Sequence, residues 1–215
     1  RVKDATTQQC QQFSRVIVRK NSMNSLNGYF KTVFEVDKIL DNEIRILLFH
    51  GVISHYRHSV RNHTRKHLSV DDFVSSIREA LELYTPVTMD ECLNACLGET
   101  DLPAQSFAVT FDDGFENNVS LAAPILVDLG VPATFYLTTG FVGTNMRSWT
   151  DDIESVLETK AATEIRGVDE SIDGRYETAE EKQMLMDTVR QIVKGNRSID
   201  PYEYADRLIE AIDPQ

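Results

Sequence analysis

The sequence predicts an α/β fold followed by a mostly helical C-terminal segment. Two short apolar runs, at residues 43–51 and 107–111, are typical of buried strands. Residues 107–138 have the pattern of a strand, a helix and a second strand, and this βαβ order requires a parallel sheet. Repeated crossovers of this kind indicate an α/β barrel or a doubly wound sheet.

Three parts follow from these patterns. Residues 1–43 form a partly irregular N-terminal extension, and residues 44–143 carry the strands and helices of the α/β domain. Residues 144–215 are mostly helical, which indicates an insertion or the truncated remainder of that domain. The chain starts with Arg1 rather than methionine, so Met23 is a hypothetical natural start. The end directly after a helical pattern predicts a fragment of a longer protein.

The first core strand, at residues 43–51, ends in a histidine and a glycine, which places His50 at an edge of the sheet. The next stretch, residues 52–68, has four histidines among arginines and no apolar period, so we expect an exposed loop. Ser69 then caps a helix with apolar residues at every fourth position and two aspartates in its first turn.

The helix after the second strand starts at Asn117 or Asn118 and ends before Gly130. Pro124 lies in its first turn or kinks it, and both alternatives fit the pattern. Residues 148–157 predict an amphipathic helix. Capping patterns open three more helices, at Thr88 with Glu91, at Thr178 with Glu181, and at Asp200 with Pro201. The dipeptide Asp173-Gly174 predicts a hairpin turn.

The charge and the hydropathy of the chain argue against several classes of protein. Its 34 acidic and 22 basic residues give a formal charge of -12, which repels nucleic acid over most of the surface. No apolar run approaches the roughly 20 residues that cross a bilayer, and no signal peptide is visible. A cytoplasmic location is therefore the default expectation. A secreted or cell-envelope location stays open if the N-terminus is incomplete.

The clearest chemical feature is an acidic pair directly after the second strand. Asp112 and Asp113, followed by Gly114, place two carboxylates at a strand end where the backbone can approach a ligand closely. One carboxylate can bind a metal ion while its neighbour handles a proton, and a bound cation relieves the repulsion within the pair. A simple turn after a strand is the alternative, because Asp-Gly is a common turn dipeptide.

The residues around this pair resemble the polysaccharide deacetylase family, also called the NodB-homology domain or carbohydrate esterase family 4. Residues 110–115 are similar to the TFDDG signature of that family. The Ala-Pro helix at 123–126 and the strand at 130–136 follow in the family's order. Residues 48–52 resemble its first strand. The resemblance covers about 115 residues, the N-terminal portion of the domain.

The resemblance implies a distorted (β/α) barrel with its catalytic residues at the carboxyl ends of the strands. It also implies a metal-dependent hydrolase that removes N-acetyl groups from an amino sugar or polysaccharide. Asp112 corresponds to the catalytic base and Asp113 to a ligand of a divalent metal ion, zinc in the usual case. The expected partner is thus a carbohydrate, and the oligomeric state is open.

The family's second motif, H-S/T-x-x-H, normally follows the aspartates, and no histidine occurs after His67 in this chain. The segment from His63 to His67 fits the motif by its letters, and an i, i+4 pair converges on one metal ion if it is helical. Its order along the chain differs from the family's. A solvated loop before the helix at Ser69 is therefore the alternative to a metal site.

Three further residues are candidates for substrate binding, and each has a structural alternative. His50 ends a core strand and either faces a pocket or is a buried histidine with satisfied hydrogen bonds. Thr138 ends the strand next to the acidic pair, although threonine is common in strands. Trp149 offers a ring for sugar stacking or packs in the core.

Two rival functions remain at this point. Without its histidine pair, the same scaffold could bind carbohydrate or act as an interaction domain without catalysis. A glycosidase is the other rival, and it would use two carboxylates that are separated in space rather than adjacent in sequence.

Overall fold

The structure is a computed structural model that describes residues 15–19 and 43–214. The hypothetical start at Met23 and most of the predicted N-terminal extension lie outside these ranges. None of the helices in the described part has the length and the apolar character needed to span a bilayer.

The described residues divide into two compact units. Unit 1 comprises the chain up to Tyr56 together with Thr64–Thr139. Unit 2 comprises Arg57–His63 together with the chain from Gly140 onward. Each unit has a hydrophobic core of its own.

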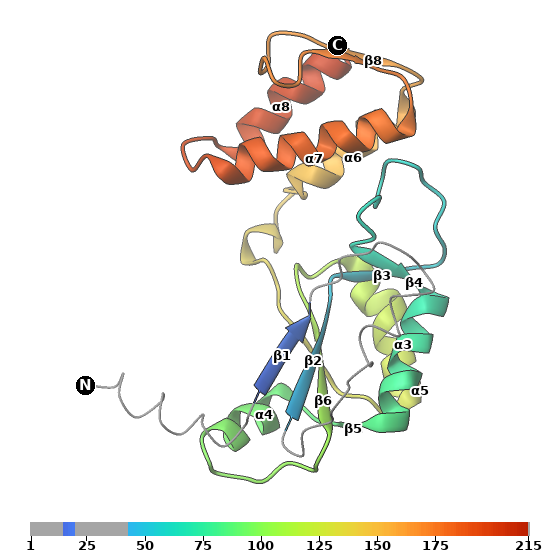
Figure 1. The fold of residues 1–215 in the computed structure, drawn as a ribbon, viewed down its shortest axis with the longest axis vertical. Coiled ribbons are helices and arrows are strands. Elements are labelled where there is room, and N and C mark those ends of the chain that lie inside the picture. Colours follow the sequence, from blue (N-terminus) through green and yellow to red (C-terminus); the bar gives the residue numbers. More distant parts are fainter. Residues whose placement is uncertain (1–14, 20–42, 215) are drawn as a thin grey trace, which may run out of the picture. The chain divides into compact units, whose positions relative to one another are not determined.

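Unit 1 is built on a five-stranded parallel sheet (Figure 1). Its strands are β1 (Arg15–Arg19), β2 (Glu43–Phe49), β5 (Thr85–Pro86), β6 (Ser106–Phe111) and β7 (Ala133–Phe135). β6 is central: β2 pairs with its full length, β5 with its first residues and β7 with its last. Every residue of β6 is buried, as its apolar sequence predicts.

Helices cover both faces of this sheet. Successive residues of a strand point to opposite sides, so the fully buried β6 has side chains to cover on both faces. The helices of unit 1 are α3 (Val70–Leu83), α4 (Met89–Cys96) and α5 (Ala123–Leu129). Phe107 and Phe111 of β6 pack into the larger core with residues of α3 and α5. Ala108 lies in a smaller cluster with Cys92 of α4 on the other face. The predicted α/β layering is therefore present.

The starts of two helices confirm the predicted caps. The Ser69 hydroxyl accepts a hydrogen bond from the Asp72 N–H at 3.2 Å at the start of α3. Thr88 and Glu91 form a reciprocal capping box at the start of α4. These bonds satisfy N–H groups that a helix start would otherwise leave without partners.

The turn before α5 decides between the two predicted positions of Pro124. Asn118–Ala122 forms a π-helical turn, in which the Ala123 N–H bonds to the Asn118 carbonyl. Pro124 then lies in the first turn of α5, where its missing N–H removes no helical bond. Gly130 ends α5 in the left-handed conformation, with φ at 67°, as predicted.

The described strands form an open sheet, so the barrel part of the predicted fold is not confirmed. After β2 the chain leaves this sheet and enters β3 (Gly51–Ile53). β3 pairs only with β4 (His67–Ser69), in a separate two-stranded parallel sheet. A barrel requires unbroken pairing around a ring, and the described strands do not provide it.

Unit 2 is mostly helical, as the sequence predicts (Figure 1). Its elements are α6 (Trp149–Thr159), β8 (Thr163–Ile165), β9 (Gly174–Tyr176), α7 (Ala179–Gly195) and α8 (Pro201–Ile212). The predicted caps at Thr178 and Asp200 are confirmed. The predicted hairpin exists, but its turn is wrong: Gly174 begins β9, and the Asp173 carboxylate closes a longer loop by accepting the Gly167 N–H at 2.9 Å.

The segment Arg57–His63 is clamped by two carboxylates of α6. Glu158 accepts the backbone N–H groups of three consecutive residues, from Ser59 to Arg61, at 2.6 to 3.2 Å. Glu154 accepts the next one, from Asn62, at 2.9 Å. Val60 is 1% exposed within the core of unit 2. The expected exposed loop is therefore confirmed for most of this segment and is wrong at Val60, because a single apolar residue produces no periodic signal.

We predict that Glu158→Gln destabilises the protein at neutral pH. Burial alone raises the pKa of the Glu158 carboxyl, but hydrogen bonds from the backbone and from the Ser59 hydroxyl outweigh it and lower that pKa below its ordinary value. A carboxyl with a lowered pKa stabilises the fold above about pH 4.3, and this stabilisation is lost as the pH falls through the folded-state value. Thermal unfolding followed by circular dichroism should show a Tm at pH 7 lower by about 4 °C.

The same measurement at lower pH gives the control. The Tm difference between Glu158→Gln and the unaltered protein should shrink between about pH 5 and about pH 3. Glu210→Gln is the matched change at an exposed glutamate of α8 and should leave the Tm unchanged. A pH-independent difference for Glu158→Gln would contradict the role of its charge.

Candidate active site

Three chain segments leave the five-stranded sheet at the same edge, directly after β2, β6 and β7. The Asp112 N–H donates to the Phe49 carbonyl at 2.9 Å, and the Tyr136 N–H donates to the Phe111 carbonyl at 2.7 Å. His50 and Asp112 each follow the last residue pair of β2 and β6. The structure thus brings the half-buried His50 and the acidic pair to one edge.

The two carboxylates of the pair have different surroundings. That of Asp112 has no hydrogen-bond or ion-pair partner among the described residues. That of Asp113 lies 3.1 Å from the Lys66 ammonium. Asp113 takes a left-handed φ of 70°, which is uncommon for a residue with a side chain, and Gly114 follows at 71°. A Cβ at Gly114 would lie 2.7 Å from Leu137 Cδ2, so glycine permits this close approach.

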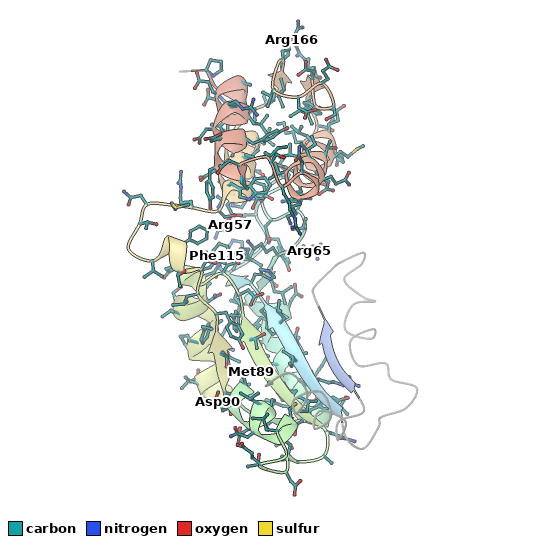
Figure 2. The ribbon with its side chains drawn as sticks, turned by 90° about the vertical axis from the view of Figure 1, so that its left-hand side faces the viewer. Arg57, Arg65, Met89, Asp90, Phe115 and Arg166 are labelled. Atoms are coloured by element: carbon teal, nitrogen blue, oxygen red, sulfur yellow. The ribbon has the colours of Figure 1, made fainter. Side chains whose placement is uncertain are left out.

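The ring of Phe115 contacts two residues of the segment that leads into β4. The Lys66 ammonium lies 4.4 Å from the ring centroid, and the His67 ring meets it edge-on at 4.6 Å. Figure 2 shows Phe115 and Arg65 at this end of unit 1, whereas Met89, the first residue of α4, lies toward the other end. Lys66 and His67 therefore lie at the strand-end edge with the acidic pair.

His67 is held by Asn117 above the backbone of Gly51. Asn117 Nδ2 lies 3.1 Å from His67 Nδ1, and with the amide as donor the imidazole carries its proton on Nε2. A Cβ at Gly51 would lie 2.2 Å from His67 Nδ1 and 2.5 Å from Asn117 Oδ1. Only glycine leaves room for this pair.

Two neighbouring asparagines keep unused hydrogen-bonding capacity at this edge. Asn118 is 1% exposed, and neither its amide oxygen nor its amide nitrogen has a partner in the part of the chain that the structure describes. The buried Oδ1 of Asn117 also lacks a partner there. Buried polar atoms without partners are costly, and π-helical turns such as the one that starts at Asn118 are frequent at functional sites. These amides are available to a ligand or to water.

The structure places two predicted site residues in unit 2. The His63 side chain is 8% exposed, and its Nε2 lies 3.1 Å from Asp187 Oδ1. His63 lies in a turn and His67 begins β4, so the two histidines do not share a helix. Trp149 begins α6 and packs partly against the core of unit 2. Thr138 differs from these residues, because it is exposed in unit 1. The prediction that it ends a strand is wrong, since β7 ends at Phe135.

Asp113 is suited to bind a cation, but the described residues do not provide a full set of metal ligands around it. No three of their histidine, cysteine, aspartate and glutamate side chains converge on one point. A catalytic zinc ion takes three protein ligands, and Asp113 is instead paired with Lys66. The described residues therefore do not by themselves fit a catalytic zinc ion.

Sequence reasoning missed Lys66 and the contact between Asn117 and His67. Asn117 was predicted only as a helix start, and Lys66 only as part of a basic loop. No local pattern predicts a contact between residues 50 positions apart. The one usable signal was Phe115, an aromatic residue beside the acidic pair that can hold a cation.

Residues 99–195 match the family model described as polysaccharide deacetylase. The matched segment includes the acidic pair, Phe115 and both asparagines, and covers a little less than half of the chain. Residues 99–195 are therefore similar to part of a polysaccharide deacetylase domain. The resemblance predicted from the residues around the acidic pair is thus confirmed. A comparison with curated proteins found no match.

Three solved structures are similar to this chain. IcaB from Ammonifex degensii is 26% identical over 54% of this chain and 48% of its own, with a TM-score of 0.41. A de-N-acetylase from Aggregatibacter actinomycetemcomitans is 20% identical over 52% and 50%, with a TM-score of 0.39. The BpsB deacetylase domain from Bordetella bronchiseptica is 17% identical over 79% and 77%, with a TM-score of 0.35. This chain spans about half the length of the first two.

The strand-end edge of this deacetylase segment combines groups with separate chemical abilities. Asp112 offers a carboxylate that has no partner among the described residues and can accept a proton. The Lys66 ammonium provides a positive charge, and the asparagine amides provide donors and acceptors. Tyr136 and Leu137, which follow β7, are large exposed side chains that can contact a substrate.

We predict that Gly51→Ala destabilises unit 1. The new methyl group would overlap the His67–Asn117 pair, and a forced displacement of this kind costs about 1–3 kcal/mol. Thermal unfolding should show a Tm lower by about 3–10 °C. Gly140→Ala is the matched control, because nothing lies within 4 Å of a Cβ at that position. Equal effects of the two changes would contradict the close contact at Gly51.

Proposed function

We propose that this chain is the strand-end part of a carbohydrate de-N-acetylase, which converts an N-acetylated amino sugar into a free amine and acetate. The observation that carries the proposal is the family's acidic pair at the carboxyl edge of a parallel sheet, with its two carboxylates in different surroundings. In α/β folds this edge is where ligands bind and where catalytic residues lie.

Asp112 acts in this proposal as the general base. Its carboxylate takes a proton from a water molecule while the water oxygen attacks the acetyl carbon. The carbon–nitrogen bond then breaks, acetate leaves with the new oxygen, and the amine nitrogen takes up a proton. The Asp112 backbone is fixed by its bond to the Phe49 carbonyl, and its side chain has no competing partner among the described residues.

Substrate contacts are proposed for the exposed residues around the same edge. Tyr136 presents a ring that can pack on a sugar, and Thr138 presents a hydroxyl group. The half-buried His50, which follows β2, is proposed as a further polar contact to the substrate at this edge. Trp149 remains a prediction of the sequence, since it packs partly against the core of unit 2.

The divalent metal ion, zinc by the resemblance, is a proposal for the same site. Asp113 would be one of its ligands. The sequence also predicts His63 and His67 as ligands, but His63 is bonded to Asp187 in unit 2 and His67 lies 3.1 Å from Asn117. Of these three residues, we therefore propose Asp113 alone as a metal ligand.

A second candidate function is carbohydrate binding without catalysis. The observation that favours it is the ion pair between Asp113 and Lys66, because a carboxylate already neutralised by an ammonium group is a weaker cation ligand. Exposed Tyr136 and Leu137 would serve such a binding surface equally well. Hydrolysis separates the two functions.

We predict that Asp112→Asn lowers the rate of N-acetyl hydrolysis by at least about 100-fold, because an amide cannot accept the proton. The measurement is the release of free amine from an N-acetylated glucosamine oligosaccharide in the presence of zinc ions. Asp128→Asn makes the same chemical change at an exposed position of α5 and should leave the rate unchanged.

Two outcomes would contradict this assignment. Equal rates for Asp112→Asn and Asp128→Asn would remove Asp112 from the role of base. Binding of the oligosaccharide by the unaltered chain without any release of amine would favour the non-catalytic function.

A further inference from the structure

The ammonium group of Lys66 forms an ion pair with Asp113, the carboxylate that the family resemblance assigns to a metal ion. Lys66 Nζ is 3.1 Å from Asp113 Oδ2, within ion-pair distance. The two side chains are 26% and 33% exposed, so water screens the pair only in part. The motif around the acidic pair gives no sign of this lysine, which lies 47 positions earlier in the chain.

The ammonium group has a second contact that fixes its position. It lies over the face of Phe115, 4.4 Å from the ring centroid, and Phe115 is two residues from its ionic partner. The negative face of an aromatic ring attracts a cation. Asp113 and Phe115, both in the segment that follows β6, therefore form a binding site for one cation.

The backbone on both sides of Lys66 is held as well. The preceding Arg65 has a left-handed φ of 50°, and its guanidinium lies over the Tyr56 ring at 4.8 Å. The following His67 pairs with Gly51 in the small parallel sheet. The backbone is thus constrained on both sides of Lys66.

We infer that Lys66 is the resident cation of Asp113, and that a divalent cation binds this carboxylate only by displacing it. A divalent ion on the same carboxylate would lie close to the ammonium group, and like charges at that separation repel strongly. The inference rests on the proposed function, in which Asp113 is a cation ligand. It adds Lys66 as a positioning residue that sets how tightly the site takes a metal ion.

The test is the affinity of the complete chain for Zn²⁺ alone, measured by isothermal titration calorimetry. Lys66→Met keeps the apolar stem and removes the charge, so we expect it to bind Zn²⁺ at least about fivefold more tightly than the unaltered chain. The gain should disappear in the double variant Lys66→Met/Asp113→Asn. Lys194→Met is the matched control at an exposed lysine of α7 and should give no gain.

Phe115→Leu tests the contribution of the aromatic ring to this cation-binding site without changing any charge. Loss of the ring should tighten Zn²⁺ binding in the same direction, by about twofold. Tighter Zn²⁺ binding by Lys66→Met but not by Phe115→Leu would overturn the role of the ring. Unchanged or weaker binding in Lys66→Met, or a gain that survives in the double variant, would overturn the inference as a whole.

Hydrolysis distinguishes failure of this inference from failure of the proposed function. An Asp112-dependent release of amine together with no gain in Lys66→Met would overturn only the inference. A gain in Lys66→Met in a chain that releases no amine would support the inference and count against the catalytic function.

Discussion

The parallel pairing of β2 with β6 is the constraint on which the candidate site depends. Its register places Phe49 opposite Phe111, and both rings belong to the larger core of unit 1. A shift of one residue would turn the apolar side chains of β6 toward the other face of the sheet. The register that fills this core also delivers His50 and Asp112 to the same edge. Packing and the position of the chemistry are therefore fixed by one set of backbone bonds.

Close backbone contacts at two glycines then build the rest of this edge. Gly51 lets the imidazole of His67 and the amide of Asn117 meet above β3, and Gly114 lets the chain pass against Leu137. The first contact joins β4 to the segment after β6, which explains why Lys66 reaches Asp113. The acidic pair thus lies in an environment made by residues far from it in sequence.

The segment between β3 and β4 serves both units. Its middle part, Arg57–His63, belongs to unit 2, where the carboxylates of Glu154 and Glu158 hold four consecutive backbone N–H groups. Its last part supplies Lys66 and His67 to unit 1. Charged groups therefore fix the middle and the last part of this segment. Hydrogen bonds to a carboxylate can hold a backbone segment that has few apolar side chains.

The sequence by itself determined β2, β6 and β7, the helix caps and the family that the segment around Asp112 resembles, because these depend on neighbours a few positions apart. A short apolar run located β6, and the pairs at Thr88 and Thr178 located helix starts. Only the tertiary structure decided that the sheet stays open among the described strands and that Lys66 pairs with Asp113. Contacts of this range follow from how strands pair and how the chain crosses between them, and no local pattern of residues encodes that choice.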